Sequence, residues 1–91
     1  MLIFVKKATA IRRKVREEEG AELRRKVGAR IRQLRKSKNM TIKELAQQMD
    51  ITPGFLGMVE RGHRGFTNYR ILLLSKVLDI SVHYLVTGKH V

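Results

Sequence analysis

Residues 41–46 have the sequence TIKELA, and residues 52–62 have the sequence TPGFLGMVERG. Thr41 with Glu44 three residues on forms a capping box, which marks the start of a short helix. Thr52 marks a second start, because the proline directly after it occupies the first helical position, where its missing N–H costs nothing. The two stretches therefore predict two short helices joined by a tight turn.

Helical signals continue on both sides of this stretch. Residues 27–34 carry an apolar stripe, and we predict that this helix ends at Asn39 in a left-handed conformation. Thr67 caps a later helix and Ser81 caps a last one, which Gly88 ends. The helix after Thr67 has apolar residues at helical spacing, namely Ile71, Leu72, Leu74, Val77 and Leu78. No strand pattern of useful length follows Val5. The fold class is therefore all-α, with five short helices, and its second and third helices have the outline of a helix-turn-helix.

Residues 6–26 are dominated by charge, with few apolar positions. Ile11, Val15 and Leu23 fall on an i, i+4 ladder in which Glu19 fills the missing position. We expect a helix that is supported by i, i+4 pairs of opposite charge and weakened or broken at Gly20. The expected pairs are Arg13 with Glu17, Lys14 with Glu18, and Glu22 with Lys26.

The apolar start Met1–Val5 has three open interpretations. It could be a short strand that pairs with another chain, a disordered arm, or an extension upstream of the true start. Five residues are too few for a signal peptide or a membrane span, so we expect no membrane partner.

The composition indicates a polyanionic partner. The chain has 91 residues and a formal charge of +12, of which 14 Lys and Arg against 4 Glu lie in residues 1–38. It has no Cys, so disulfides and thiolate metal sites are excluded, and we expect a cytoplasmic protein. His63, His83 and His90 lack metal-ligand spacing, and no catalytic set stands out. We therefore expect no metal, no cofactor and no enzyme activity.

Residues 27–88 resemble the XRE family, the Cro/C1-type (lambda repressor-like) helix-turn-helix domain. The resemblance rests on GARIRQLR at 28–35, LA at 45–46, ERG at 60–62 and LDISV at 78–82. It implies a five-helix domain over 27–88, preceded by a basic, partly helical extension over 1–26 and followed by a tail over 89–91. It also implies a buried ion pair between Arg35 and Glu60.

The resemblance implies that the third helix reads base edges in the major groove of double-stranded DNA. Its outward positions should be Pro53, Gly54, Gly57 and Met58, none of which offers the bidentate hydrogen bonds that Arg, Gln or Asn give to bases. Ile42 stands where the family commonly has a phosphate-binding Gln. The expected DNA-binding residues are Thr41, Lys43, Thr52, Pro53, Gly54, Gly57, Met58, Arg61, His63, Arg64, Asn68 and Arg70.

These observations favour a sequence-specific transcriptional regulator, a repressor acting on operator DNA as a homodimer. The loop at residues 60–67 also resembles that of restriction-modification controller proteins, and antitoxins are a further subclass. The alternative is a protein-interaction module or antitoxin-like partner with weak, mainly phosphate-driven DNA binding. The extension could then bind DNA, a protein partner or a second copy; residues 82–86 are another candidate dimer surface. Binding of the basic extension to a membrane surface is the weakest hypothesis, because the extension lacks a broad apolar face.

Overall fold

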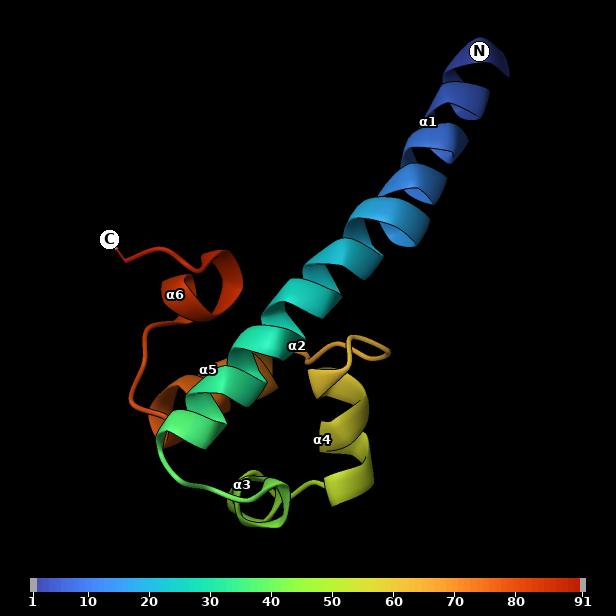
Figure 1. The fold of residues 1–91 in the computed structure, drawn as a ribbon. Coiled ribbons are helices and arrows are strands. Elements are labelled where there is room, and N and C mark those ends of the chain that lie inside the picture. Colours follow the sequence, from blue (N-terminus) through green and yellow to red (C-terminus); the bar gives the residue numbers. More distant parts are fainter. Residues whose placement is uncertain (1, 91) are drawn as a thin grey trace.

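The computed structural model describes the backbone of residues 2–90 and the side chains of residues 6–90, and this part of the chain contains helices and loops but no strand. The helices are α1 (Leu2–Lys14), the π-helical turn η1 (Val15–Glu19), α2 (Gly20–Ser37), α3 (Ile42–Gln48), α4 (Pro53–Glu60), α5 (Asn68–Val77) and α6 (Val82–Thr87). The first three run end to end as one rod, and its N-terminal part projects from the bundle that α3–α6 form around α2 (Figure 1). The predicted all-α bundle of five helices is confirmed, and its first helix is continuous with the extension.

Local capping sets the boundaries of the four short helices. Each helix starts after a residue whose side-chain oxygen accepts a hydrogen bond from the N–H three residues on, and these residues are Thr41, Thr52, Thr67 and Ser81. The chain turns through left-handed residues after the helices, at Asn39, Asp50, Gly62, Asp79 and Gly88. The predicted starts of these helices are confirmed, as are the predicted ends at Asn39 and Gly88.

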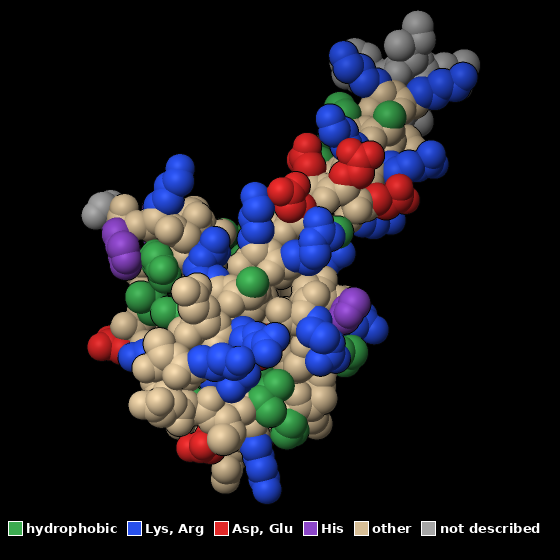
Figure 2. Space-filling model, viewed as in Figure 1, with side chains coloured by type: hydrophobic (Ala, Val, Ile, Leu, Met, Phe, Trp, Pro, Cys, Tyr) green, Lys and Arg blue, Asp and Glu red, His purple; other side chains and the backbone are tan. Residues whose placement is uncertain are grey.

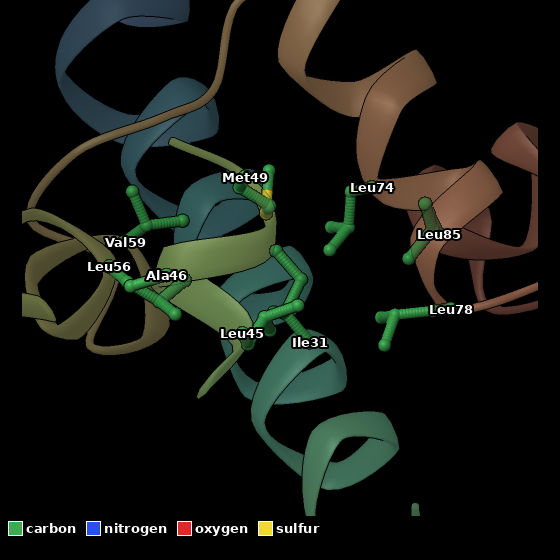
Figure 3. Close-up of a cluster of buried hydrophobic side chains, with 9 residues drawn as sticks. All are labelled: Ile31, Leu45, Ala46, Met49, Leu56, Val59, Leu74, Leu78 and Leu85. Atoms are coloured by element: carbon green, nitrogen blue, oxygen red, sulfur yellow. The ribbon is translucent and has the colours of Figure 1, made fainter. Parts of the chain in front are cut away.

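The core joins the two halves of the bundle. Figure 3 shows the side chains of α3 and α4 on one side of Ile31 and those of α5 and α6 on the other. The buried apolar residues are Ile31, Leu45, Ala46, Met49, Leu56, Val59, Leu74, Leu78 and Leu85. The Arg30 Nη1 also donates a 2.7 Å hydrogen bond to the Leu85 carbonyl oxygen, which ties α6 to α2. Leu72 departs from the predicted apolar stripe, since 51% of it is exposed.

Two glycines bring α2 and the end of α4 into backbone contact. A Cβ added at Gly28 would collide with the carbonyl oxygen of Val59 and lie 2.8 Å from that of Glu60. A Cβ added at Gly62, where φ is +82°, would lie 2.8 Å from the Cα of Arg25. Neither position has room for a side chain, so these glycines fix the distance between α2 and α4.

The N-terminal segment differs from the sequence-based expectation in two ways. The helix begins at Leu2, so the strand interpretation is wrong for Leu2–Val5, while Met1 lies outside the described residues. The helix also continues through Gly20, because the Gly20 N–H bonds to the carbonyl oxygen of Val15, five residues back, and closes a π turn instead of breaking the rod.

The π turn also changes which charges meet. Among the side chains of residues 6–26, only Glu22 and Lys26 form an ion pair, at 3.1 Å. The predicted pairs of Arg13 with Glu17 and of Lys14 with Glu18 do not form. Glu17 and Glu18 both lie in the π turn, where the i, i+4 register is lost, although Arg13 and Glu17 still line the same hollow. No helix within residues 2–90 is both long enough and apolar enough to cross a membrane.

Candidate nucleic-acid interface

The α3–turn–α4 unit is held together by short-range hydrogen bonds. The Thr41 N–H donates to Glu44 Oε1 and the Glu44 N–H donates to Thr41 Oγ1, both at 3.1 Å, which completes the predicted capping box. Hydrogen bonding of the Thr41 backbone N–H and, to a smaller extent, of the Thr41 side chain to the Glu44 carboxylate lowers its pKa below the ordinary value, because these bonds favour the ionised form. Beyond α3, the Ile51 N–H bonds to the Ala46 carbonyl oxygen at 3.0 Å and closes the turn. The unit is therefore rigid enough to present α4 as a fixed surface.

A buried ion pair connects this unit to α2. Arg35 Nε lies 2.8 Å from Glu60 Oε2, Nη2 lies 3.0 Å from Oε1, and Nη1 donates to the Met40 carbonyl oxygen at 2.9 Å. Both side chains are buried, with 10% of Arg35 and 5% of Glu60 exposed. The bidentate contact with Glu60 raises the pKa of Arg35, and burial opposes this shift only in part. The pair anchors the C-terminal end of α4 and satisfies the carbonyl group that leads into α3.

A basic hollow of about 450 Å³ lies above this pair. Its walls come from the C-terminal half of α2, the start of α3 and the end of α4, and its lining includes Arg32, Thr41, Ile42 and Arg61. Arg32 and Arg61 form no ion pair with any side chain in residues 6–90. Figure 2 shows Lys and Arg side chains gathered over this part of the molecule. Positive charge and the N-terminus of a helix both favour the binding of phosphate groups, and this hollow has both.

The N-terminus of α4 offers few donors for DNA. Thr52 Oγ1 accepts from the Phe55 N–H at 3.1 Å, and Pro53 has no N–H, so Gly54 carries the one N–H of the first three residues that lacks a helical partner. A Cβ added at Gly54 would meet no atom within 4 Å, so the backbone here is open to close approach. Met58 is half-buried. The exposed surface at the start of α4 can approach the DNA backbone closely. It offers few hydrogen-bonding groups that would distinguish one base pair from another.

Gly57 does not face outward as the sequence suggested. It is buried, and a Cβ at this position would lie 3.1 Å from Arg61 Nη1 and 3.6 Å from Ile42 Cδ1. The cause is the folding of the Arg61 side chain back over α4, together with the side chain of Ile42 from α3. Gly57 thus provides the space beneath the Arg61 guanidinium, and its contact with DNA stays a prediction.

The remaining predicted residues lie in two places. Arg70, in the first turn of α5, reaches toward the start of α4, with its guanidinium 5.2 Å from the centre of the Phe55 ring, in a hollow that Thr52 also lines. Lys43 is exposed on the first turn of α3, and His63, Arg64 and Asn68 are exposed on and after the loop that follows α4. Arg64 and Asn68 line a groove of about 250 Å³ together with Arg24.

The fold brings three further cations to this region: Arg32, which was outside the expected DNA-binding set, and Arg24 and Arg25, which the sequence offered for DNA only as part of the basic extension. Arg32 lines the basic hollow, Arg24 faces the groove beside the loop, and the backbone of Arg25 packs against Gly62. The Nε of Arg24 is buried without a hydrogen-bond partner among the described residues. Helical spacing of Arg32 relative to Arg35 could have placed it on the α3 side of α2, whereas the contact of Arg24 and Arg25 with the loop depends on long-range packing.

Comparison with known proteins identifies the family. A family model described as helix-turn-helix matches residues 31–85. The HTH-type transcriptional regulator SinR of Bacillus subtilis is 40% identical over 67 residues, which are 70% of this chain and 59% of SinR. SinR of Bacillus licheniformis is 39% identical over 66 residues, covering 69% of this chain and 58% of that protein. The chain thus spans about six-tenths of the length of these curated relatives.

Solved structures agree with this assignment. The restriction-modification controller protein C.AhdI from Aeromonas hydrophila has a TM-score of 0.66 and 37% identity, over 71% of this chain and 97% of that one. The clp gene regulator ClgR from Corynebacterium glutamicum has a TM-score of 0.65 and 32% identity, over 69% of this chain and 82% of its own. The chain belongs to the XRE-type helix-turn-helix family of transcriptional regulators.

Proposed function

We propose that this chain is a cytoplasmic transcriptional regulator that binds double-stranded DNA through α3 and α4. The observation that carries the proposal is the basic hollow, where Arg32 and Arg61 flank the N-terminus of α3 beside the exposed face of α4. The formal charge of +12 and the membership of a family of regulators support the same function. Neither a cofactor nor a catalytic step is required.

Phosphate contacts supply most of the binding in this proposal. Arg32, Lys43, Arg61, Arg64 and Arg70 border the interface, while base contact is left to Thr52, Gly54 and Met58. Phosphate contacts position a protein on the duplex without reading sequence, so specificity would come from a few base contacts and from DNA shape. Such a domain acts as a repressor when it occupies an operator as a homodimer on two half-sites about one helical turn apart.

The domain limits remain part of the proposal. Residues 27–88 form its DNA-binding unit, residues 1–26 the extension and residues 89–91 the tail. Arg24 and Arg25 precede residue 27 but contact the loop after α4. A functional fragment should therefore begin no later than Gly20, the first residue of α2.

A second function, binding of a protein partner, is favoured by the weak reading face. One free N–H and one hydroxyl at the start of α4 are few donors for a sequence-specific reader. In that case the chain would bind duplex DNA of any sequence with equal affinity, and the projecting helix would make the specific contact with the protein partner.

Selection of duplexes from a random library, using the full chain, tests the two functions against each other. We expect an enriched sequence, which Arg61→Ala combined with Arg64→Ala should bind at least tenfold more weakly. Lys89→Ala is the matched control, because Lys89 is an exposed cation after α6 and lines none of the hollows beside α3 and α4. Failure to enrich any sequence, with equal binding to random duplex, would favour the protein-interaction function.

A further inference from the structure

The projecting part of the rod exposes apolar side chains along one face. Ile11 is 54% exposed, and Val15 and Leu23 are each 49% exposed; Leu23 stands at the base of the projection, where it also lines the groove of about 250 Å³ beside the bundle. No segment of α3–α6 covers α1 or η1, which project beyond the bundle (Figure 1). A helix of this length without tertiary packing is marginally stable in water, so a partner that covers this face would stabilise it.

The π turn keeps these three residues in line. In an uninterrupted α-helix Leu23 would be turned roughly 80° around the axis from Val15, because eight residues exceed two full turns. A π turn holds one more residue per turn and removes most of this offset. Ile11, Val15 and Leu23 therefore form an apolar ridge along the rod, interrupted between Val15 and Leu23 by the position of Glu19.

The charges beside the ridge are divided into blocks. Residues 6–16 carry six Lys and Arg and no acid, whereas residues 17–22 carry four Glu and no base. Figure 2 shows the acidic side chains as a cluster partway along the projecting helix, between basic side chains on either side. Glu17, Glu18 and Glu19 form no ion pair with any side chain in residues 6–90. The acidic block is thus available to an external cationic surface.

We infer that the projecting helix, residues 6–23, pairs antiparallel with the same segment of a second copy of this chain. Centred at the level of residue 17, this pairing sets Ile11 opposite Leu23 of the second copy. It also sets the basic stretch 12–16 opposite the acidic stretch 18–22, so that opposite charges meet twice, as two-fold symmetry requires. A parallel pair would place like charges against each other along its whole length. Duplex DNA fits the surface less well, because the acidic block would bring carboxylates close to phosphates.

Disulfide mapping tests the direction of pairing. Because the chain has no native Cys, every disulfide must join introduced cysteines. Equal amounts of full-length Ile11→Cys and Leu23→Cys proteins are mixed and oxidised, and the crosslinks are identified by mass spectrometry. We expect the mixed 11–23 disulfide to exceed the 11–11 and 23–23 disulfides at least fivefold. A majority of 11–11 and 23–23 disulfides would show a parallel pair and overturn the inference.

Sedimentation of the full chain tests the contribution of charge. Lys14 lies on the same side of the ridge as Glu18, so Lys14→Glu should weaken self-association at least tenfold. Arg13→Glu makes the same change in net charge on the opposite side of the helix, and it should change the dissociation constant less than twofold. Mixing Lys14→Glu with a chain carrying Glu18→Lys and Glu22→Lys should restore association between the two variants.

Three outcomes would overturn the inference. The parent chain could remain monomeric at about 100 µM. It could form a dimer that neither Lys14→Glu nor Val15→Asp weakens, which would place the dimer contact elsewhere, for example on α6. Finally, Lys14→Glu could lower affinity for duplex DNA without changing the sedimenting mass, which would assign the projecting helix to DNA. Circular dichroism of each variant confirms that the bundle is folded.

Discussion

A methyl group added at Gly28 would collide with the backbone of α4, whereas one added at Gly54 would meet no atom within 4 Å. Both glycines lie in helices, but one marks a contact between helices and the other an exposed turn. Similar contrasts separate the arginines, since Arg35 is paired with Glu60 in the interior while Arg64 is exposed. The type of residue at a position therefore does not reveal its role in this protein; the packing around that position does.

Gly28→Ala should destabilise the fold, because α2 and α4 must separate to admit the new Cβ. We expect the free energy of unfolding to fall by about 3 kcal/mol, the upper part of the range for overpacking. Gly54→Ala is the matched control and should raise it by about 0.5–1 kcal/mol, because alanine favours the helix. Urea denaturation measures both, and a tolerated Gly28→Ala would contradict the close α2–α4 contact.

Glu60→Ala should lower the free energy of unfolding by about 3–5 kcal/mol, because Arg35 would remain buried without its partner. Arg64→Ala should change it by less than about 0.5 kcal/mol, since an exposed cation without an ion pair contributes little. Thermal melting of the two variants beside the parent gives the comparison. If Glu60→Ala melts like the parent, the ion pair does not stabilise the contact between α2 and α4.

The capping box predicts a dependence on pH. The pKa of Glu44 is lower in the folded chain than in the unfolded chain, so its contribution is fully present above its ordinary value and is lost as pH falls through the folded value. Between about pH 6 and pH 3, Glu44→Gln should therefore lose less stability than the parent. Chemical denaturation at each pH measures this difference, and parallel curves would exclude a role for the Glu44 carboxylate.

At the scale of elements, the features that the sequence predicted are the local ones. Thr41, Thr52, Thr67 and Ser81 cap helices because each bonds an N–H only three residues away, so a single sequence suffices to find them. The resemblance anticipated the contact between Arg35 and Glu60. The burial of Gly57 and the π turn at Val15–Glu19 escaped prediction, because they depend on the Arg61 rotamer and on the register of the rod.

The π turn offers a test of the inferred self-association. Deletion of Glu17 would turn η1 into α-helix and leave Val15 and Leu23 nearly in line, so we expect both helix content and self-association to be retained. Insertion of one alanine after Glu17 would turn Leu23 away by about 100° and should abolish self-association. Circular dichroism and sedimentation report the two properties, and equal association of the two variants would contradict the ridge.

At the scale of the whole molecule, one rod serves two surfaces. Its C-terminal half contributes Gly28, Ile31, Arg32 and Arg35 to the bundle and the basic hollow, while its N-terminal half carries the exposed ridge. The net charge of the first 38 residues therefore has two roles, one beside the helix-turn-helix and one along the projecting helix. Total charge and family resemblance indicated a nucleic-acid partner, but only the packing of α2 against α4 separates these roles.

The salt dependence of DNA binding by the full chain tests the central claim most directly. Five cations border the interface, and each phosphate contact contributes about −0.9 to the slope of log affinity against log salt, so we expect a slope of about −4 or steeper per chain. Arg64→Ala should make the slope less steep by about 1, while Lys89→Ala should leave it unchanged. A slope near zero, or no binding to any duplex at about 0.1 M salt, would contradict a DNA interface built on phosphate contacts.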